Sequence, residues 1–499
     1  MKNPLDAVIN FFSPQAGLIR AKSRMQLENA ERSYDIASKS RRNSGWFRPE
    51  TSGAQEASTA FRLAANTGHE LVRNNPLAKR ARNVWASNVV GGGIQLEATG
   101  ISDAKSKKFN EAWDEWAEST DIDFEGHHTL YGLQDLWMKT VVETGGVFIR
   151  NHVNKSKKFP LQLQTIEQTF LDNSKNGITE NGTLIDGIEY DAQGQVRGYW
   201  LKSEETHTKL GKPPKSKFHK SSKMIHIFRK DRAGQHLGIT WFHAVATTLR
   251  NYNTYQDAKL MQQQIAACFA LIVEEAETGM GANTTSSDLP DEIQPAMVEY
   301  VKAGQKVTTV TPPKADNSNN FDIAIKRDIA SGLDLTYEQL TGDYSLVNFA
   351  SGRMGKSEFF NQLDNVQKNL MKPALDKIFR WFLDLYGIGN GVNGTFKADW
   401  TFPPRAAVNP QEEFDVLMSK VRHGMMSPTK AAKILGERLP HIIEQWKKDK
   451  KLFGELPFDI DPSKFASTGN QLDDNDAASG NKKEDSKKEE TKPKKKEEE

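Results

Sequence analysis

Acidic and imidazole side chains gather most densely in the segment DIDFEGHH, residues 121–128. Carboxylates and imidazoles bind divalent metal ions, so one function to consider is a metal-dependent DNA-processing enzyme built around Asp121, Asp123, His127 and His128. The spacing of these residues matches no defined ligand set, and no H-E-x-x-H motif accompanies them. The favoured interpretation is an exposed loop between two helices, and no metal or cofactor is expected.

Two glycine-containing segments are reminiscent of phosphate-binding loops. GGGIQLE, residues 91–97, leads into a predicted strand, whereas a phosphate cradle leads into a helix. GRMGKSEFF, residues 352–360, contains G-K-S but lacks the first glycine of a P-loop at the required distance. We therefore predict a turn at the first segment and treat the second as a coincidence, so ATP hydrolysis by a P-loop is not expected.

A polar loop precedes one of the longest predicted helices. Thr341-Gly342-Asp343 is typical of a turn, residues 348–355 are mostly small and polar, and an apolar periodic run begins at Phe359. The residues alone are compatible with an ordinary helix-capping loop.

Charge and composition exclude several classes of protein. Lys and Arg number 67 against 65 Asp and Glu, which argues against a tight, salt-sensitive grip on DNA phosphates. Cys268 is the single cysteine among 499 residues, so no disulfide within the chain and no cysteine-based zinc cluster can form. No apolar run of 18 residues occurs, so neither a membrane span nor a signal peptide is expected.

The elements of the first half predict an α+β fold. Residues 54–90 show a helical pattern that Asn74-Asn75-Pro76 should break, and residues 105–145 have apolar residues at helical spacing. Strand patterns then follow, including a hairpin signal at DAQGQ. The predicted strands are GGVFIRNHV, LQLQTIEQ, GIEYDAQGQVRGYWL and KMIHIFR.

Residues 239–273 predict one helix about 50 Å long, at 1.5 Å per residue. Only Arg250, Asp257 and Lys259 are charged in it, whereas a solvent-facing helix would normally carry more charge. Packing against a copy of itself in a neighbouring subunit explains this composition best.

Further helices are predicted at 321–332 and 351–386, and Pro373 should kink the second of these. The segment KADWTF predicts a strand, and residues 409–450 predict short helices. The Lys- and Glu-rich end lacks apolar residues and predicts disorder.

Seven segments, in order along residues 55–440, together resemble the lambda family of portal proteins of tailed bacteriophages. They are LVRNNPLAKRARNVWASNVVGGGI, GLQDLWMKTVVETGGVFIR, LQLQTIEQTFLD, GIEYDAQGQVRGYWL, MIHIFRKDRAGQHLGITWF, YQDAKLMQQQIAACFALI and IASGLDLTYEQLTGDYSLVNFASGRMGKSEF.

The resemblance implies a structural protein without enzymatic activity. It implies a ring, typically of twelve subunits, at one capsid vertex, through which double-stranded DNA is packaged and ejected without sequence specificity. The implied partners are the large terminase, head-completion and tail adaptor proteins, and the major capsid and scaffold proteins, with no membrane. The implied location is the virion, and the host cytoplasm during assembly.

The family architecture, carried onto this chain, divides it into consecutive regions. They are an N-terminal arm (1–54), an α+β wing (55–201), a candidate clip (202–222), a strand and long stem helix (223–276), a wing continuation (277–340), a channel loop (341–351), a long kinked helix (352–388), a helical crown (389–465) and a disordered tail (466–499).

The resemblance also implies roles for three groups of residues. The expected DNA-channel loop residues are Asp343, Tyr344, Ser345, Asn348 and Ser351. The expected stem residues that pack between subunits are Leu249, Tyr252, Tyr255, Gln256, Gln262 and Ile265. The expected clip residues that face the terminase or adaptors are Lys209, Lys212, Lys215 and Lys217.

Two alternatives remain open at this point. The metal-dependent enzyme described above would show metal-dependent DNA cleavage that Asp123→Ala abolishes. A monomeric virion adaptor would use the same helices for contacts with other proteins and would form no closed ring.

Overall fold

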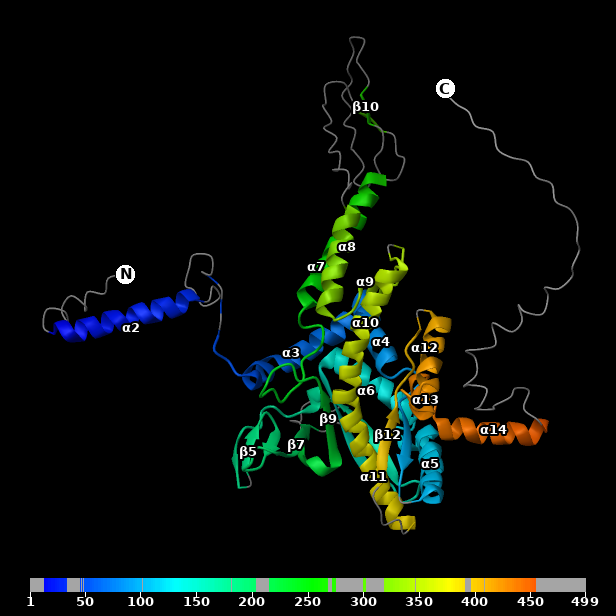
Figure 1. The fold of residues 1–499 in the computed structure, drawn as a ribbon. Coiled ribbons are helices and arrows are strands. Elements are labelled where there is room, and N and C mark those ends of the chain that lie inside the picture. Colours follow the sequence, from blue (N-terminus) through cyan, green and yellow to red (C-terminus); the bar gives the residue numbers. More distant parts are fainter. Residues whose placement is uncertain are drawn as a thin grey trace, which may run out of the picture. The chain divides into compact units, whose positions relative to one another are not determined.

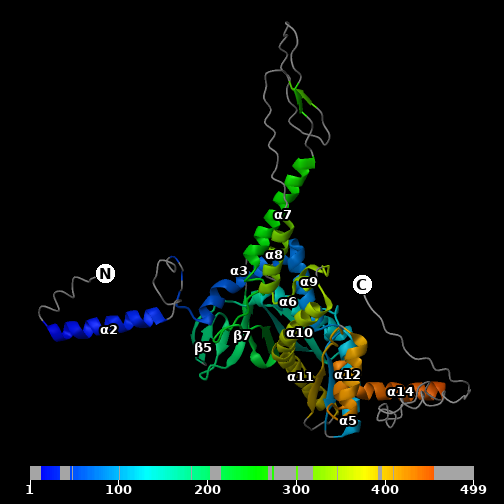
Figure 2. The same cartoon turned by 45° about the horizontal axis from the view of Figure 1, so that its top comes forward.

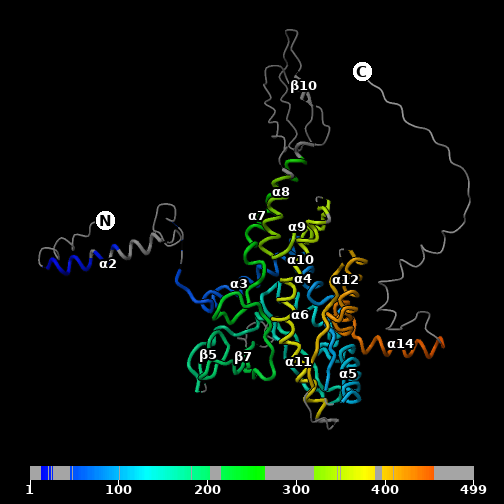
Figure 3. Tube along the Cα trace, viewed as in Figure 1, coloured from blue at the N-terminus to red at the C-terminus, as the bar shows by residue number. Residues whose placement is uncertain are grey.

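The structure is a computed structural model that describes residues 13–33, 45, 47, 49–100, 102–180, 182–202, 215–267, 272–274, 299–301, 318–345, 347–390, 396–407 and 409–454. The chain divides into two compact units, residues 1–56 and 57–499. The first unit holds helix α2 (Pro14–Ser33), which lies in the segment predicted as an arm, and the first residues of α3. The remaining elements belong to the second unit (Figures 1 and 3).

The predicted helix break at Asn74-Asn75-Pro76 is confirmed. Helix α3 (Gly53–Asn74) ends there, and α4 (Pro76–Val89) begins with proline at its first position. The Asn75 side chain accepts a hydrogen bond from the Ala78 amide at 3.0 Å, which satisfies one free donor of the first turn. The glycines at 91–93 then turn the chain into strand β1 (Gln95–Thr99), as predicted, and β1 pairs antiparallel with β12 (Lys397–Thr401).

The two helices predicted within residues 105–145 are α5 (Asp103–Glu118) and α6 (Leu130–Thr144), with a 3-10 turn at Thr120–Ile122 between them. Their apolar faces meet α4 and α11 in one core rich in aromatic rings. Trp113 stacks edge-on against Trp116 at 4.9 Å and against Phe382 of α11 at 5.2 Å. Side chains from segments more than 250 residues apart therefore share this core.

The predicted strands are present, in two antiparallel sheets. One has the order β3-β2-β9 and the other the order β4-β5-β6-β7-β8. The hairpin expected at DAQGQ joins β6 and β7. The strands are β2 (Gly146–Val153), β3 (Leu161–Glu167), β4 (Gly177–Thr179), β5 (Gly182–Ile185), β6 (Ile188–Tyr190), β7 (Val196–Lys202), β8 (Ser216–Lys220) and β9 (Met224–Phe228), with 3-10 turns at Gln168–Phe170 and Ser221–Lys223.

The long helix predicted at 239–273 is shorter at both ends. Helix α7 covers Ala246–Ala267, and residues 272–274 form strand β10, which pairs parallel with β11 (Glu299–Val301). The Trp241 amide donates to the Val142 carbonyl of α6 at 3.1 Å, so the backbone before α7 bonds to another helix. The apolar spacing continues through 241–245 because Trp241, Phe242 and Val245 are buried in the core.

The predicted helix at 321–332 is α8 (Ser318–Gly332), which contacts α7. Both views of the ribbon show α7 and α8 side by side, extending from the sheets and helices of the body (Figures 1 and 2). The Trp85 indole of α4 donates to the Leu333 carbonyl at 3.0 Å, and Asn75 donates to Asn253 of α7 at 2.9 Å. The base of the helix pair is thus anchored to α4.

The helix predicted at 351–386 is continuous but changes its hydrogen-bond pattern. Helix α10 (Phe349–Val366) passes through a π turn at Gln367–Met371 into α11 (Lys372–Asn390). Pro373 is the second residue after that turn, and its ring removes a backbone donor there. Gln367 is buried there and donates to the Val89 carbonyl at 3.0 Å.

The predicted C-terminal short helices are α12 (Pro410–Arg422), α13 (Pro428–Ile434) and α14 (Leu439–Phe453). Within the described part of the chain, no helix combines the length and apolar character needed to cross a membrane.

Candidate functional site

The α7–α8 pair is held together by a polar cluster around Asp322. One carboxylate oxygen accepts hydrogen bonds from the Tyr252 hydroxyl and the Gln256 amide, both at 2.7 Å. The other accepts from the Lys326 ammonium at 2.6 Å, one turn further along α8. Since Tyr252 and Gln256 also lie one turn apart on α7, the cluster links the two helices over one turn of each.

The cluster shifts the pKa values of its members. Burial raises the pKa of Tyr252 to about 12, and the adjacent Asp322 adds to this effect. Burial alone would raise the pKa of Asp322, but the hydrogen bonds from Lys326 and Tyr252 outweigh it and hold that pKa below its ordinary value. Asp322 is therefore charged at neutral pH.

The residues of α7 that were predicted to pack between subunits have different surroundings within their own subunit. Leu249 is 0% exposed and Tyr252 is 7% exposed, so both side chains pack mainly within their own subunit. Tyr255 stacks edge-on against Phe321 of α8 at 5.3 Å, and Gln256 belongs to the Asp322 cluster. Gln262 is half-buried, whereas the side chain of Ile265 lies outside the described residues.

Other apolar side chains of the helix pair do face outward. Leu260 and Met261 of α7 and Phe321 of α8 are each more than half exposed. Neighbouring subunits could reach these residues, which the sequence prediction did not name.

The candidate channel loop begins at a well-capped short helix, α9 (Tyr337–Thr341). The Thr336 hydroxyl accepts from the Gln339 amide, and the Gln339 side chain accepts from the Thr336 amide in return. Gly342 ends the helix at φ 77°, a conformation that favours glycine, and an added Cβ would lie 3.0 Å from the Arg80 guanidinium. The start of the loop is thus fixed in place.

The loop residues named from the sequence divide into two kinds. Asn348 caps α10 by accepting from the Ser351 amide at 2.8 Å, and the Ser351 hydroxyl donates to Asn348. These two residues therefore act in helix capping, the alternative that the sequence left open. Tyr344 is 62% exposed, and Asp343 and Ser345 are exposed beside it.

Asp343 is organised by its neighbours although it is exposed. Its carboxylate accepts from the Ser345 amide at 3.0 Å and from the Tyr337 hydroxyl at 3.3 Å. The hydrogen bonds from Ser345, with a smaller contribution from Tyr337, hold its pKa below the ordinary value. The single acid named in the predicted loop is therefore charged at neutral pH.

Cationic side chains lie near the loop. The Arg80 guanidinium donates to the Gln339 carbonyl at 2.9 Å, and Arg327 lies 5.8 Å from the centre of the Tyr337 ring. Arg327, Tyr337 and Gly355 also line a surface cavity of about 370 Å³ between α8, α9 and α10. Arg80 precedes Gln339 by 259 residues, and no local sequence signal could have linked the two.

Of the candidate clip residues, Lys209 and Lys212 lie outside the described residues. Lys217 is exposed on β8, which forms an edge of the five-stranded sheet, and Lys215 is exposed directly before it.

The acidic and imidazole segment at 121–128 is a structured loop. The Asp123 carboxylate is buried and accepts hydrogen bonds from the backbone amides of Glu125, His127 and His128 at 3.0 to 3.2 Å. Among the described residues, no group of three or more His, Cys, Asp or Glu could hold a metal ion. The role of Asp123 here is to fix the loop.

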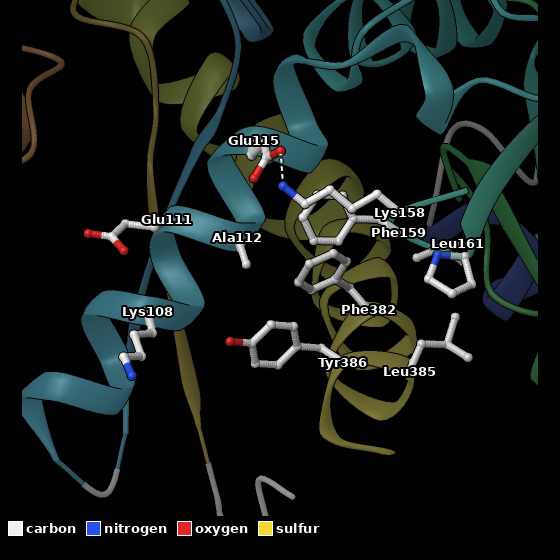
Figure 4. Close-up of a pocket in the computed structure, with 11 residues that line it drawn as sticks. Lys108, Glu111, Ala112, Glu115, Lys158, Phe159, Leu161, Phe382, Leu385 and Tyr386 are labelled. Carbon is white, nitrogen blue, oxygen red and sulfur yellow. Dashed lines mark hydrogen bonds and ion pairs between the residues drawn. The ribbon is translucent and has the colours of Figure 1, made fainter. Parts of the chain in front are cut away.

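A second cavity, of about 520 Å³, lies between α5, the β2–β3 connection and the end of α11 (Figure 4). Phe382 and Tyr386 of α11 line it together with Phe159, and Lys158 pairs with Glu115 at its edge. Phe382 belongs to the aromatic core, so this cavity is a depression at the margin of that core.

Comparison with known proteins defines the class. The family model described as phage portal protein, lambda family, matches residues 39–367. The probable portal protein of Halomonas phage phiHAP-1 is 26% identical over 404 residues, which cover 75% of each chain. Portal protein B of Escherichia phage lambda is 22% identical over 434 residues, covering 75% of this chain and 81% of that protein.

Solved structures with similar chains include the neck of a native gene transfer agent particle computed with C12 symmetry. That match has a TM-score of 0.42 at 14% identity and covers 79% of this chain and 97% of the other. An HK97 family phage portal protein from Corynebacterium diphtheriae matches with a TM-score of 0.31 at 12% identity. The match covers 70% of this chain and 96% of that one.

The family match spans well over half of the chain, and the chain belongs to the lambda family of phage portal proteins. Proteins of this family are structural, and this chain is a component of the phage head–tail connector, not an enzyme.

Proposed function

We propose that this portal protein assembles into a closed ring of twelve subunits at one vertex of the capsid. Double-stranded DNA passes through the ring during packaging and ejection, without recognition of its sequence. The family match over residues 39–367 carries this proposal. The assembled protein resides in the virion, and assembly takes place in the host cytoplasm.

The α7–α8 pair serves as the stem of each subunit. Its internal contacts around Asp322 make it a preformed unit, and its outward apolar residues Leu260, Met261 and Phe321 supply contacts to neighbouring stems. Burial of such side chains between subunits stabilises the ring by roughly 25 cal/mol per Å² of apolar surface.

The loop between α9 and α10 faces the channel. Tyr344 and Ser345 project from it, while Asn348 and Ser351 hold the start of α10. Among the five named residues only Asp343 is charged, and its negative charge opposes the attraction of DNA phosphates to the nearby Arg80 and Arg327. DNA can therefore slide past the loop with little retention.

The remaining partners are the large terminase, the head-completion and tail adaptor proteins, and the major capsid and scaffold proteins, with which the ring helps to initiate head assembly. The lysines at 209, 212, 215 and 217 remain the predicted contact with terminase or adaptors, because Lys215 and Lys217 are exposed.

Deletion of the gene from a phage that encodes this chain tests the proposal. We expect heads without DNA, and we expect the wild-type chain supplied in trans to restore DNA-filled, infectious particles. Infectious, DNA-filled particles formed without the chain would refute the conduit function.

A further inference from the structure

The three-stranded sheet packs one of its faces against the five-stranded sheet. Phe148 of β2 stacks on His226 of the neighbouring strand β9 at 4.2 Å and meets Tyr199 of β7 edge-on at 4.9 Å. Phe148 and Tyr199, together with Met224 and Leu201, belong to a buried apolar cluster between the two sheets. Side chains on the facing sides of these sheets therefore meet.

Polar residues continue both of these faces beyond the apolar cluster. Arg150 and His152 follow Phe148 at two-residue steps along β2, so they lie on the same face of that strand. His219 of β8 is paired with Tyr199, so it lies on the facing side of the other sheet. All three polar side chains are partly exposed, whereas the apolar cluster is buried. The space between the sheets thus ends in an arginine and two histidines.

The imidazole of His152 is held in place by two neighbours. Its Nε2 atom donates to Oε1 of Gln164 on β3 at 2.8 Å, and Gln164 is buried. The ring of Phe124 stacks on the imidazole at 4.4 Å. Because Nε2 is engaged by Gln164, a ligand in the space between the sheets would meet the Nδ1 atom of this ring.

Positive charge dominates the surroundings of both imidazoles. Burial lowers the pKa of His219 to about 4, and the nearby charges of Arg150 and Lys217 add to this effect. Burial also lowers the pKa of His152, and the charges of Arg150 and Lys223 add to it, against the hydrogen bond to the β3 glutamine. Among the described residues, no carboxylate contributes as strongly to either shift as these cations do. Both imidazoles are therefore uncharged at neutral pH.

The chain around β8 is rich in lysine. No aspartate or glutamate occurs within residues 206–223, whereas six lysines do. Two of these lysines, Lys217 and Lys223, are exposed beside the imidazoles. At the start of β8, the carboxylate of Asp172 is compensated in part by Lys202, whose ammonium lies 3.8 Å away. The excess of positive charge at this end of the two sheets is suited to an anion.

We propose that the polar end of the space between the two sheets binds a doubly charged tetrahedral oxyanion, the chemistry of a phosphate group. Arg150 supplies a planar guanidinium that matches such a group, and Lys217 and Lys223 add exposed charge. The negative charge of the anion favours protonation of His152 and His219, which then act as further donors, so binding takes up protons. The site lies within one subunit and does not depend on the proposed ring.

Backbone hydrogen exchange of the full-length chain in sodium sulfate, compared with sodium chloride at the same ionic strength, tests the site. Sulfate is the probe because it keeps two negative charges across the pH range in which histidine titrates. We expect sulfate to slow exchange in peptides from β2, β8 and β9 in a saturable manner. The apparent affinity should be about fourfold higher at about pH 6 than at about pH 8, because protonation of the imidazoles is linked to binding.

Substitutions separate the contributions to binding. Lys217→Gln/Lys223→Gln removes two exposed charges without disturbing the buried cluster, and we expect it to weaken sulfate binding about fivefold. His219→Gln should remove most of the pH dependence, because glutamine does not titrate. Arg422→Gln/Lys430→Gln, at exposed positions of α12 and α13, is the matched control, which removes the same number of charges elsewhere and should leave binding unchanged.

Equal slowing by chloride and sulfate would overturn the inference, as would a sulfate effect that the lysine variant and its control weaken equally. Once sulfate binding is established, a short DNA duplex identifies the source of the anion. Slowing of the same peptides at a much lower phosphate concentration of DNA than of sulfate would assign the site to nucleic acid. No effect of DNA on these peptides would assign it to a free anion such as inorganic phosphate.

Discussion

Asp322→Asn is the most direct test of the α7–α8 pair as a preformed unit. Asparagine keeps the size of the side chain but removes the charge that accepts hydrogen bonds from Tyr252, Gln256 and Lys326 at 2.6 to 2.7 Å. Hydrogen bonds to a charged group contribute about 1.5–3 kcal/mol, against about 1 kcal/mol for neutral pairs. Since Lys326 is partly solvated and regains water, we expect a net loss of about 1–2 kcal/mol.

Backbone hydrogen exchange measured by mass spectrometry reports this loss locally. A loss of 1.4 kcal/mol in local stability accelerates exchange about tenfold, so we expect a roughly five- to thirtyfold acceleration in peptides from 246–267 and 318–332. Peptides from β2 and β3 should be unaffected, because their ladders do not involve the helix pair.

Asp135→Asn is the matched control. Asp135 pairs with Lys139 one turn away, but both side chains are more exposed than those of Asp322 and Lys326, and this ion pair lies within the single helix α6. Its loss should cost less than about 0.5 kcal/mol. The reasoning would be refuted if Asp322→Asn left exchange in α7 and α8 unchanged, or if the two substitutions had equal effects there.

Four further predictions concern residues outside the Asp322 cluster. Leu249→Ala should lower the free energy of unfolding by about 3 kcal/mol in urea titrations, because Leu249 is fully buried, whereas Leu260→Ala should leave subunit stability unchanged and lower only the ring fraction in native mass spectra. Asn348→Ala should cost about 1 kcal/mol of helix capping and accelerate exchange at the start of α10; an unchanged rate would show that the cap is not formed in solution. Tyr344→Ala should leave unfolding unchanged but alter the yield of DNA-filled heads, and an unaltered yield would argue against a channel position for this residue. Burial lowers the pKa of His226 to about 3, so the unfolded chain binds a proton at this residue at a higher pH than the folded chain does. The free energy of unfolding should therefore fall as the pH drops from about 6.5 toward 3. His226→Gln should flatten this pH dependence in urea titrations across that range.

The sequence predicted the ends of helices and strands well where a particular residue type, such as a capping asparagine or a proline, determines where the element begins. Asn75 and Pro76 specify a cap and a first helical position. The first four residues of β2 and of β3 are all buried, so both faces of these strands are covered there. The start of α7 was predicted too early because Trp241 and Phe242 fit a helical spacing while serving the core in an irregular segment. Apolar periodicity shows that side chains are covered, but it does not show whether a helix continues.

The same limit applies to the predicted stem residues, since periodicity does not show which chain covers a side chain. The sparse charge on α7 predicted that other protein covers much of it. For Leu249 and Tyr252 the cover comes from the same chain, whereas much of the rest of α7 is exposed in this subunit. Asp322 and Lys326 are only one turn apart on α8, but the contact of Asp322 with Tyr252 joins residues 70 positions apart in the chain. The position of Arg80 near the loop is likewise a tertiary contact that no local sequence pattern predicts.

Electron microscopy of the purified full-length chain, with native mass measured on the same sample, tests the central claim most directly. The account predicts closed rings with a central hole and a mass that is a whole multiple of the 56.0 kDa subunit, twelvefold for the proposed assembly. A chain that stays monomeric across a range of protein and salt concentrations, including with its scaffold and capsid partners present, would contradict it.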